Sequence, residues 1–232
     1  MKEASQQDLS RRQLLRMGVT AATAGLLAGG LELALPMTAR AQSTLTPDAA
    51  LAELTAGNKR YTAGHLKSHD KDLATLRQQT EEKQEPFAAV LSCADSRVPV
   101  ELVFDQSIGH IFVTRVAGNI ITPEIIGSLE YGAAVLGTKV ILVMGHSNCG
   151  AVKATIQGKE VPGQISSLFP HIQPAVDQAG HDLEAATKAN AKIQAKLLSQ
   201  SSTVISGMVK SGKLKVTSGY YDLGSGSVTL LE

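Results

Sequence analysis

Two short segments of the 232-residue chain carry residue types that could do chemistry. Residues 93–97 read Cys-Ala-Asp-Ser-Arg, and residues 145–150 read Gly-His-Ser-Asn-Cys-Gly. Cys93, His146 and Cys149 offer two thiolates and an imidazole, which are donor types that zinc prefers. Magnesium and calcium prefer oxygen ligands, and the chain has only two cysteines, too few for an all-cysteine iron–sulfur cluster. The residue types therefore predict one zinc ion per chain, held by these three side chains.

The first segment also contains an acid and a base two residues apart, Asp95 and Arg97. A guanidinium can pin a carboxylate through two parallel hydrogen bonds. Held off the metal, Asp95 can accept a hydrogen bond from metal-bound water; released, it is an alternative fourth ligand. Three protein ligands and one open position are typical of catalytic zinc, because structural zinc closes its shell with four ligands. We therefore predict that Asp95 and Arg97 are catalytic, the alternative interpretation being an ordinary salt bridge in a loop.

Apolar runs in the sequence indicate how these segments are positioned. Continuous apolar runs of strand length occupy residues 87–91, 111–116 and 140–144, and helical stretches such as residues 123–136 separate them. Such runs are typical of strands covered on both faces. The fold class is therefore α/β, with a mainly parallel central sheet flanked by helices. Cys93 and the His146–Cys149 segment each follow a strand, at the sheet edge where open α/β sheets bind ligands.

The remaining elements are expected at both ends of the domain. Thr46 is a plausible N-cap for a helix with Pro47 in its first position. A second helix is expected over about residues 70–80, and a third over about residues 182–210. Residues 213–221 and 228–231 lie on either side of a glycine-rich turn and predict a C-terminal hairpin.

The first 41 residues resemble an export signal, and we exclude them from the fold argument. Residues 10–15 (SRRQLL) form a twin-arginine pattern, and a weakly apolar run over residues 17–35 follows. Residues 39–41 (ARA) have the spacing that a signal peptidase reads, which places the expected cleavage before Gln42. The domains are therefore a twin-arginine signal peptide over residues 1–41 and a catalytic domain over residues 42–232.

The alternative interpretation of the N-terminal run is a membrane anchor. The run is interrupted by Glu32 and is poor in large apolar residues, whereas a membrane span needs about 20 strongly apolar ones. We therefore expect no stable membrane anchor after cleavage, and a periplasmic or secreted protein exported through the twin-arginine pathway.

Composition limits the partners of the chain. Of its residues, 43% are hydrophobic and 19% charged, and the formal net charge is +1. The basic residues are dispersed, without the basic stripe typical of nucleic-acid-binding proteins or a polybasic run for anionic lipids. We therefore expect no nucleic-acid partner.

The chemical segments resemble the two zinc motifs of the β-class carbonic anhydrases. The first match is residues 93–98 (CADSRV) and the second is residues 145–150 (GHSNCG). The similarity extends through residues 54–61, 115–119 (RVAGN) and 128–131 (SLEY), and so covers nearly all of the chain after the signal. The resemblance implies a zinc-dependent enzyme that interconverts carbon dioxide and bicarbonate, built as a homodimer or a higher homo-oligomer.

The resemblance also implies roles for single residues. Cys93, His146 and Cys149 would hold zinc, and Asp95 with Arg97 would form the gating pair. The substrate-binding residues that it implies are Gln84, Phe112, Ala117, Tyr131 and Gly150, with Tyr131 contributed across a subunit interface. One branch of the family uses a tryptophan-containing pocket to bind bicarbonate at a non-catalytic site. The chain has no Trp, so we expect the branch without that pocket.

Three other functions fit the same residues. A hydrolase of carbon disulfide or carbonyl sulfide would use the same chemistry behind a narrower, more apolar entrance. A redox or metal-buffering protein would pair Cys93 and Cys149 reversibly. A permanent disulfide is the first expectation for two cysteines of an exported chain, but both lie where open α/β sheets bind ligands, at the carboxyl ends of strands. A catalytically silent protein on this fold would be expected to lack a ligand or the Asp–Arg pair, and all of these residues are present.

Overall fold

The computed structural model describes residues 43–68 and 73–231. The predicted signal peptide lies outside the described residues, as do the first residues predicted for the second helix. Among the described residues, no helix combines the length and the apolar character that crossing a bilayer requires.

A five-stranded sheet forms the centre of the domain, in the order β2-β1-β3-β4-β5. Strands β2, β1, β3 and β4 are parallel to one another, and β5 is antiparallel to β4, which confirms the predicted fold class and the C-terminal hairpin. The observed bounds differ from the predicted ones by at most two residues at either end of each strand. They are Ala88–Ser92 for β1, Ile111–Arg115 for β2, Val140–His146 for β3, Lys215–Tyr221 for β4 and Val228–Leu231 for β5.

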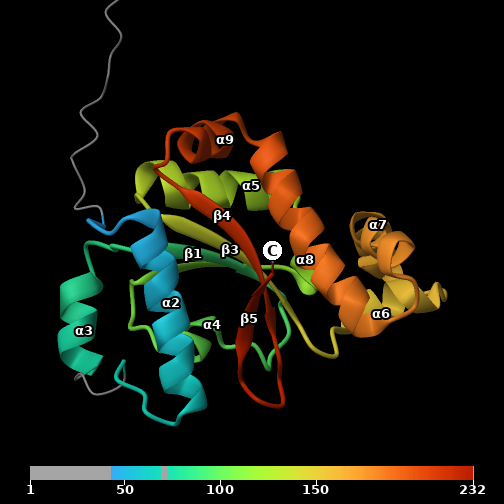
Figure 1. Cartoon of the computed structure of the whole chain (residues 1–232), viewed down its shortest axis with the longest axis horizontal. Helices are drawn as coiled ribbons and strands as arrows, with labels where there is room; N and C mark the ends of the chain where they lie inside the picture. The colour runs from blue at the N-terminus through green and yellow to red at the C-terminus, as the bar shows by residue number, and fades with distance from the viewer. Residues whose placement is uncertain (1–42, 69–72, 232) are drawn as a thin grey trace, which may run out of the picture. The chain divides into compact units, whose positions relative to one another are not determined.

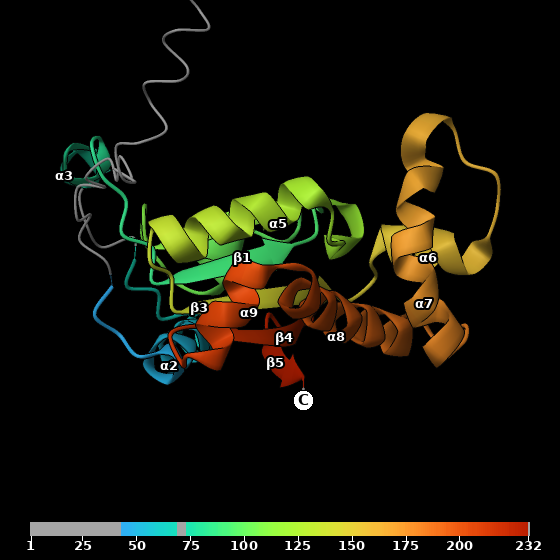
Figure 2. The ribbon, with the colours of Figure 1, turned by 90° about the horizontal axis from the view of Figure 1, so that it is seen from above.

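Helices cover both faces of the sheet (Figures 1 and 2). Alternate residues of the fully buried β1 enter different clusters: Ala88 and Val90 pack with α2 and α4, whereas Ala89 and Leu91 pack with α5, α8 and α9. This alternation explains why the sequence of β1 is apolar throughout. The helix bounds are Pro47–Thr62 for α2, Val100–Val103 for α4, Pro123–Glu130 for α5, Leu183–Ser201 for α8 and Thr203–Lys210 for α9.

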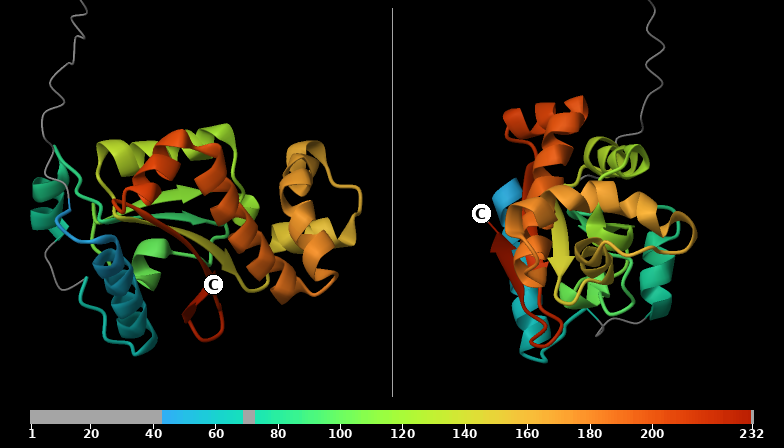
Figure 3. Two further views of the ribbon diagram at one scale, coloured as in Figure 1. Left: turned by 45° about the horizontal axis from the view of Figure 1, so that its top comes forward. Right: turned by 90° about the vertical axis from the view of Figure 1, so that its right-hand side faces the viewer.

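The remaining elements lie near the two ends of the strands. Helices α6 and α7 lie beyond the carboxyl ends of the strands, and α3 lies at the opposite end (Figures 1 and 3). A short 3-10 helical turn, η1, follows β2, and a π-helical segment, η2, continues from α5. The bounds are Leu73–Thr80 for α3, Ala117–Asn119 for η1, Tyr131–Val135 for η2, Gly150–Gln157 for α6, Gly163–Leu168 for η3 and Phe169–Ala179 for α7.

Local capping explains where the predicted helices begin and end. Thr46 caps α2 as predicted, because its hydroxyl accepts a hydrogen bond from the Ala49 amide at 3.2 Å. The single helix expected over residues 182–210 is divided at Ser202. The extended backbone of Ser202 ends α8, and its hydroxyl accepts a hydrogen bond from the Ile205 amide and donates one to Glu130. Ser202 therefore acts as the N-cap of α9.

Two residues of α2 explain how that helix docks on the sheet. A Cβ atom on Gly57 would lie 1.8 Å from the carbonyl oxygen of Phe104, so only glycine permits this approach to the end of α4. The neighbouring Asn58 is buried and donates hydrogen bonds to the carbonyls of Val103 and Gly226. Its side-chain oxygen accepts a hydrogen bond from the Val228 amide. Asn58 thus joins α2, α4 and the C-terminal hairpin.

A buried carboxylate next to α4 holds the following loop. The Asp105 side chain is fully buried and pairs with the Arg60 guanidinium of α2. Its other oxygen accepts hydrogen bonds from the Lys67 and Ser68 amides, each at 2.9 Å. Although burial alone would raise it, the pKa of Asp105 is lowered to about 2 by Arg60 and these amides. The ionised form therefore stabilises the fold.

We predict that Asp105→Asn lowers the free energy of unfolding by roughly 2 kcal/mol at pH 7. A carboxyl group whose pKa falls from near 4 in the unfolded chain to about 2 in the folded one stabilises the fold by about that amount. Asn also tolerates the positive φ of this residue, 46°. A lowered pKa contributes stability above the unfolded-state pKa near 4 and loses it as the pH falls through 2. Urea titrations should therefore show the wild type and the variant converging between pH 4 and pH 2. The control Asp177→Asn, at an exposed position, should change stability by less than about 0.5 kcal/mol.

Candidate metal centre

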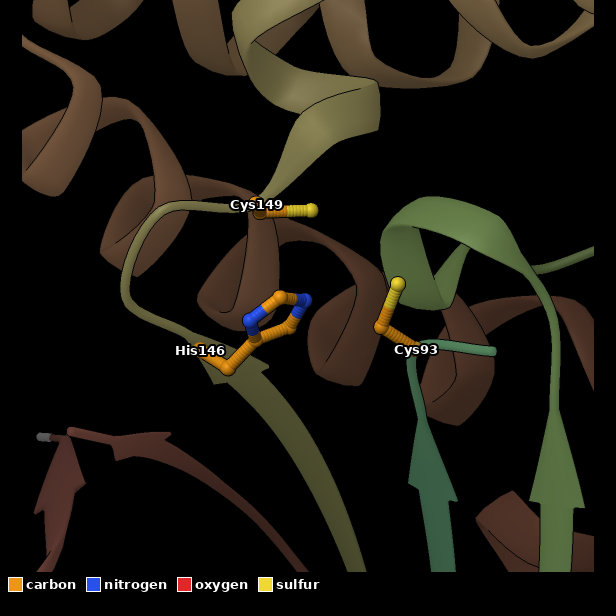
Figure 4. A group of neighbouring side chains, drawn as sticks. All are labelled: Cys93, His146 and Cys149. Atoms are coloured by element: carbon orange, nitrogen blue, oxygen red, sulfur yellow. The ribbon is translucent and has the colours of Figure 1, made fainter. Parts of the chain in front are cut away.

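Adjacent parallel strands bring together residues 93–97 and 145–150, the two segments that contain the cysteines. Strands β1 and β3 pair directly, with Ser92 opposite Met144. Cys93 follows the end of β1, His146 ends β3, and Cys149 is the N-cap of α6. The two sulfur atoms and a ring nitrogen of His146 lie within 4.8 Å of one another, and all three residues are buried. Figure 4 shows the imidazole and the two thiol side chains pointing toward a common space.

The ring of His146 is held by its own loop. Its Nδ1 lies 2.9 Å from the Ser147 carbonyl, which can only accept a hydrogen bond, so the neutral ring carries its proton on Nδ1. The lone pair of Nε2 is then available to a ligand. Nε2 is buried and has no hydrogen-bond partner among the described residues. A buried nitrogen without a partner is costly unless a ligand binds it.

The two thiols are free and influence each other. A hydrogen bond with Cys149 is the largest cause that lowers the pKa of Cys93. The same contact, together with burial, raises the pKa of Cys149. A divalent cation between the sulfurs would favour two thiolates.

Asp95 and Arg97 form the predicted pair. Arg97 donates two side-chain hydrogen bonds to the two carboxylate oxygens, at 2.9 and 2.8 Å, and its amide donates a third at 2.9 Å. The Arg97 side chain holds the pKa of Asp95 well below its usual range. One oxygen of Asp95 lies 3.8 Å from Nε2 of His146. The carboxylate is thus ionised beside the three donor atoms and held by the guanidinium.

Arg115 also helps to build the site, a role that was not predicted from the sequence. Its guanidinium donates hydrogen bonds to the carbonyls of Cys93, at 3.0 Å, and of Asp95. Arg115 therefore fixes the backbone that presents a thiol and the carboxylate. The only signal in the sequence was its place in residues 115–119, which carry part of the resemblance.

The structure divides the implied substrate-binding residues into two groups. Ala117 follows β2, and Gly150 follows Cys149, so both lie at the edge that holds the thiols.

The other implied residues lie away from that edge. Phe112 lies opposite Ala89, which is four residues before Cys93, and is thus roughly 13 Å from Cys93 along the strand direction. Tyr131 contacts Phe112, with ring centroids 6.3 Å apart, and Gln84 is exposed before β1. Within one chain, these last three residues do not join the cluster.

The donor set fits a zinc ion. Two sulfur atoms and one imidazole nitrogen match the ligands of known zinc sites, and three protein ligands leave a position open. The unpartnered Nε2 of His146 and the two free thiols are the groups that such an ion would satisfy. Cys93, His146 and Cys149 would therefore hold the metal, with Asp95 beside it.

Comparisons with known proteins bear on the fold and the family of the chain. The family model described as carbonic anhydrase matches residues 88–228. Carbonic anhydrase 2 of Mycobacterium tuberculosis is 32% identical over 192 residues, covering 79% of this chain and 92% of the relative. A solved β-carbonic anhydrase from Coccomyxa, in complex with acetazolamide, is 27% identical, with a TM-score of 0.60, covering 68% of this chain and 78% of that one.

A further solved structure supports the fold alone. The β-carbonic anhydrase CafA of Aspergillus fumigatus is 23% identical, with a TM-score of 0.64 over 80% of this chain and 90% of that one. The fold and the Cys–His–Cys cluster at its carboxyl edge define an α/β enzyme with a metal-binding site. The chain belongs to the carbonic anhydrase family, in its β class.

Proposed function

We propose that this chain is a zinc-dependent enzyme that catalyses the reversible hydration of carbon dioxide to bicarbonate and a proton. The observation that carries the proposal is the buried Cys–His–Cys cluster beside a carboxylate that Arg97 holds in place. One zinc ion per chain would act there as a Lewis acid and make hydroxide available near neutral pH. The family of the chain supports the same reaction.

The residues around the cluster can orient the reaction. Asp95 is ionised over the whole working pH range, so its free lone pairs can accept a hydrogen bond and aim a nucleophilic oxygen at carbon dioxide. Arg97 holds both carboxylate oxygens of Asp95 and would keep them from turning toward a bound cation. Arg97 also reaches the Asn148 carbonyl at 3.4 Å and so links the loops that carry Cys93 and Cys149.

We further propose that the active form is a homodimer in which each site is completed by its partner. Strand β2 is an edge strand of the sheet, and Leu73, Ile108 and Tyr131 near it are exposed apolar side chains. A cavity of about 510 Å³, lined in part by Leu73, Ile108 and Ile111, lies on the same side. A second copy covering this edge would bury these groups. It would also carry Gln84 and Tyr131 toward the neighbouring cluster.

The gating role predicts the behaviour of Arg97→Leu. Wild-type protein should contain about one zinc per chain and hydrate carbon dioxide in a stopped-flow assay. The variant keeps all three ligands, so zinc content should stay near normal. Activity at neutral pH should fall by at least about tenfold, because Asp95 is free to bind the ion. Zinc-edge absorption should then show an added carboxylate oxygen among the ligands.

Two comparisons make that result interpretable. Cys149→Ser should lose zinc and activity together, whereas a thiol pair with only a redox role would leave metal content unchanged. Lys210→Leu, at an exposed position on α9, should keep both properties. Near-normal turnover in Arg97→Leu would reduce the Asp–Arg pair to a loop salt bridge.

The shared-site proposal predicts complementation between two inactive variants. Gln84→Ala keeps an intact metal centre, and Asp95→Asn keeps an intact Gln84. Each homodimer should have low activity. A heterodimer, isolated through two different affinity tags, combines one wild-type site with one doubly changed site and should regain about half of the wild-type activity. A heterodimer no more active than its parents would show that Gln84 does not act across the interface.

We also propose export through the twin-arginine pathway, followed by function in the periplasm or outside the cell. The proposal rests on residues 10–15 and 39–41 of the sequence. Replacing Arg11 and Arg12 with Lys should leave uncleaved precursor in the cytoplasm, as measured by fractionation and immunoblotting. Efficient export of that double variant would contradict the targeting proposal.

A further inference from the structure

Helix α8 carries two amide side chains that are buried next to the metal centre. Asn190 is 0% exposed and Gln194 is 1% exposed. The two residues are one helical turn apart and therefore lie on one face of α8. Burial of an amide is costly unless its hydrogen bonds are made. The hydrogen-bond partners of these two side chains therefore show which part of the backbone α8 keeps in place.

The two amides hold the η1 turn and the segment that follows it. Asn190 donates a hydrogen bond from Nδ2 to the Gly118 carbonyl at 2.8 Å. Gln194 accepts one from the Ile121 amide at 2.8 Å and donates one to the His171 carbonyl of α7 at 2.8 Å. Gln194 also donates to Oδ1 of Asn190 at 3.2 Å. The pair thus connects α8 and α7 to the turn that follows β2.

The η1 segment also contacts Cys93, a proposed metal ligand. The amide of Gly118 donates a hydrogen bond to Sγ of Cys93 at 3.4 Å. Gly118 has a φ of 76°, and a Cβ atom on it would lie 2.7 Å from Cδ1 of Ile172. The position therefore requires glycine. Asn190 holds the carbonyl of the same residue whose N–H faces the sulfur. The two groups belong to neighbouring peptide planes, so α8 restrains the backbone that aims that N–H.

We propose that Asn190 is a positioning residue for the metal centre, and that with Gln194 it fixes the Gly118 N–H as a hydrogen-bond donor to the Cys93 sulfur. Such a donor withdraws charge from a thiolate and restricts its direction, which sets how strongly the sulfur binds a cation. The inference rests on the proposed metal-dependent function. It assigns a role in metal binding to residues 72 and 76 positions away from Gly118 in the sequence.

The test replaces the amide of Asn190 with an apolar side chain of similar size. Asn190→Leu removes the hydrogen bond to Gly118 without adding charge. Leu198→Ala is the matched control, because Leu198 is also fully buried on α8 but packs in the cluster around α5 and α9. Both variants are expected to lower fold stability. Only Asn190→Leu should weaken zinc binding, by about 10- to 100-fold in competition with a chelator.

A direct measurement detects the hydrogen bond itself. In wild-type protein loaded with cadmium-113, a soft cation suited to the two thiolates, the Gly118 amide proton should show scalar coupling to the metal through the N–H···S bond. The coupling should persist in Leu198→Ala and disappear in Asn190→Leu. The conservative change Gln194→Met leaves the bond from Asn190 in place and should reduce the coupling without abolishing it.

The outcomes separate the two proposals. If wild-type protein binds neither zinc nor cadmium, the proposed function fails. If it binds both metals but the Gly118 amide shows no coupling, or if Asn190→Leu keeps both the coupling and the wild-type zinc affinity, the positioning role is overturned while the proposed function stands. If Asn190→Leu does not fold, the wild-type coupling and Gln194→Met still decide the question.

Discussion

The parallel pairing of β1 with β3 is the interaction on which the site depends. Because Ser92 lies opposite Met144, the chain leaves β1 at Cys93 beside the end of β3, where His146 points toward the same space. Side chains alternate between the faces of a sheet, so a slip of one residue would send the apolar residues of either strand to the wrong side. The two buried clusters that fix this register therefore also fix the distances between the ligands.

The surroundings of the cluster combine opposing requirements. Two thiols and an imidazole are buried, which favours neutral forms, whereas metal binding requires thiolates. The fold compensates with groups that favour negative charge: the Gly118 amide at Cys93, and the first amides of α6 at Cys149. Arg97 balances Asp95 nearby. The cluster is therefore prepared for a cation by backbone amides more than by additional side chains.

The sequence was sufficient to predict which three side chains cluster, because Cys93, His146 and Cys149 lie in two short segments that each follow an apolar strand. It also predicted the sheet and the start of α2, where local patterns and capping decide the outcome. The break at Ser202 was missed although its cap on the Ile205 amide is local; the second hydrogen bond of the same hydroxyl, to Glu130, is long-range. The placement of Gln84 and Phe112 away from the cluster could not be inferred, since matching a motif does not tell which chain completes a site. Arg115 and Asn190 act on backbone carbonyls, and such contacts leave no pattern in residue types.

The strand order has a consequence for the kinetics of folding. All three residues of the Cys–His–Cys cluster lie between residues 93 and 149, whereas β4, which covers the other side of β3, begins at Lys215. During synthesis the ligand segments therefore leave the ribosome well before the strand that completes the centre of the sheet. Joining β3 to β4 is a contact of high sequence separation, and contacts of this kind slow folding. Until α8 and β4 have been added, β3 has an open edge, and the nascent thiols are exposed to whatever cations or oxidants surround the chain.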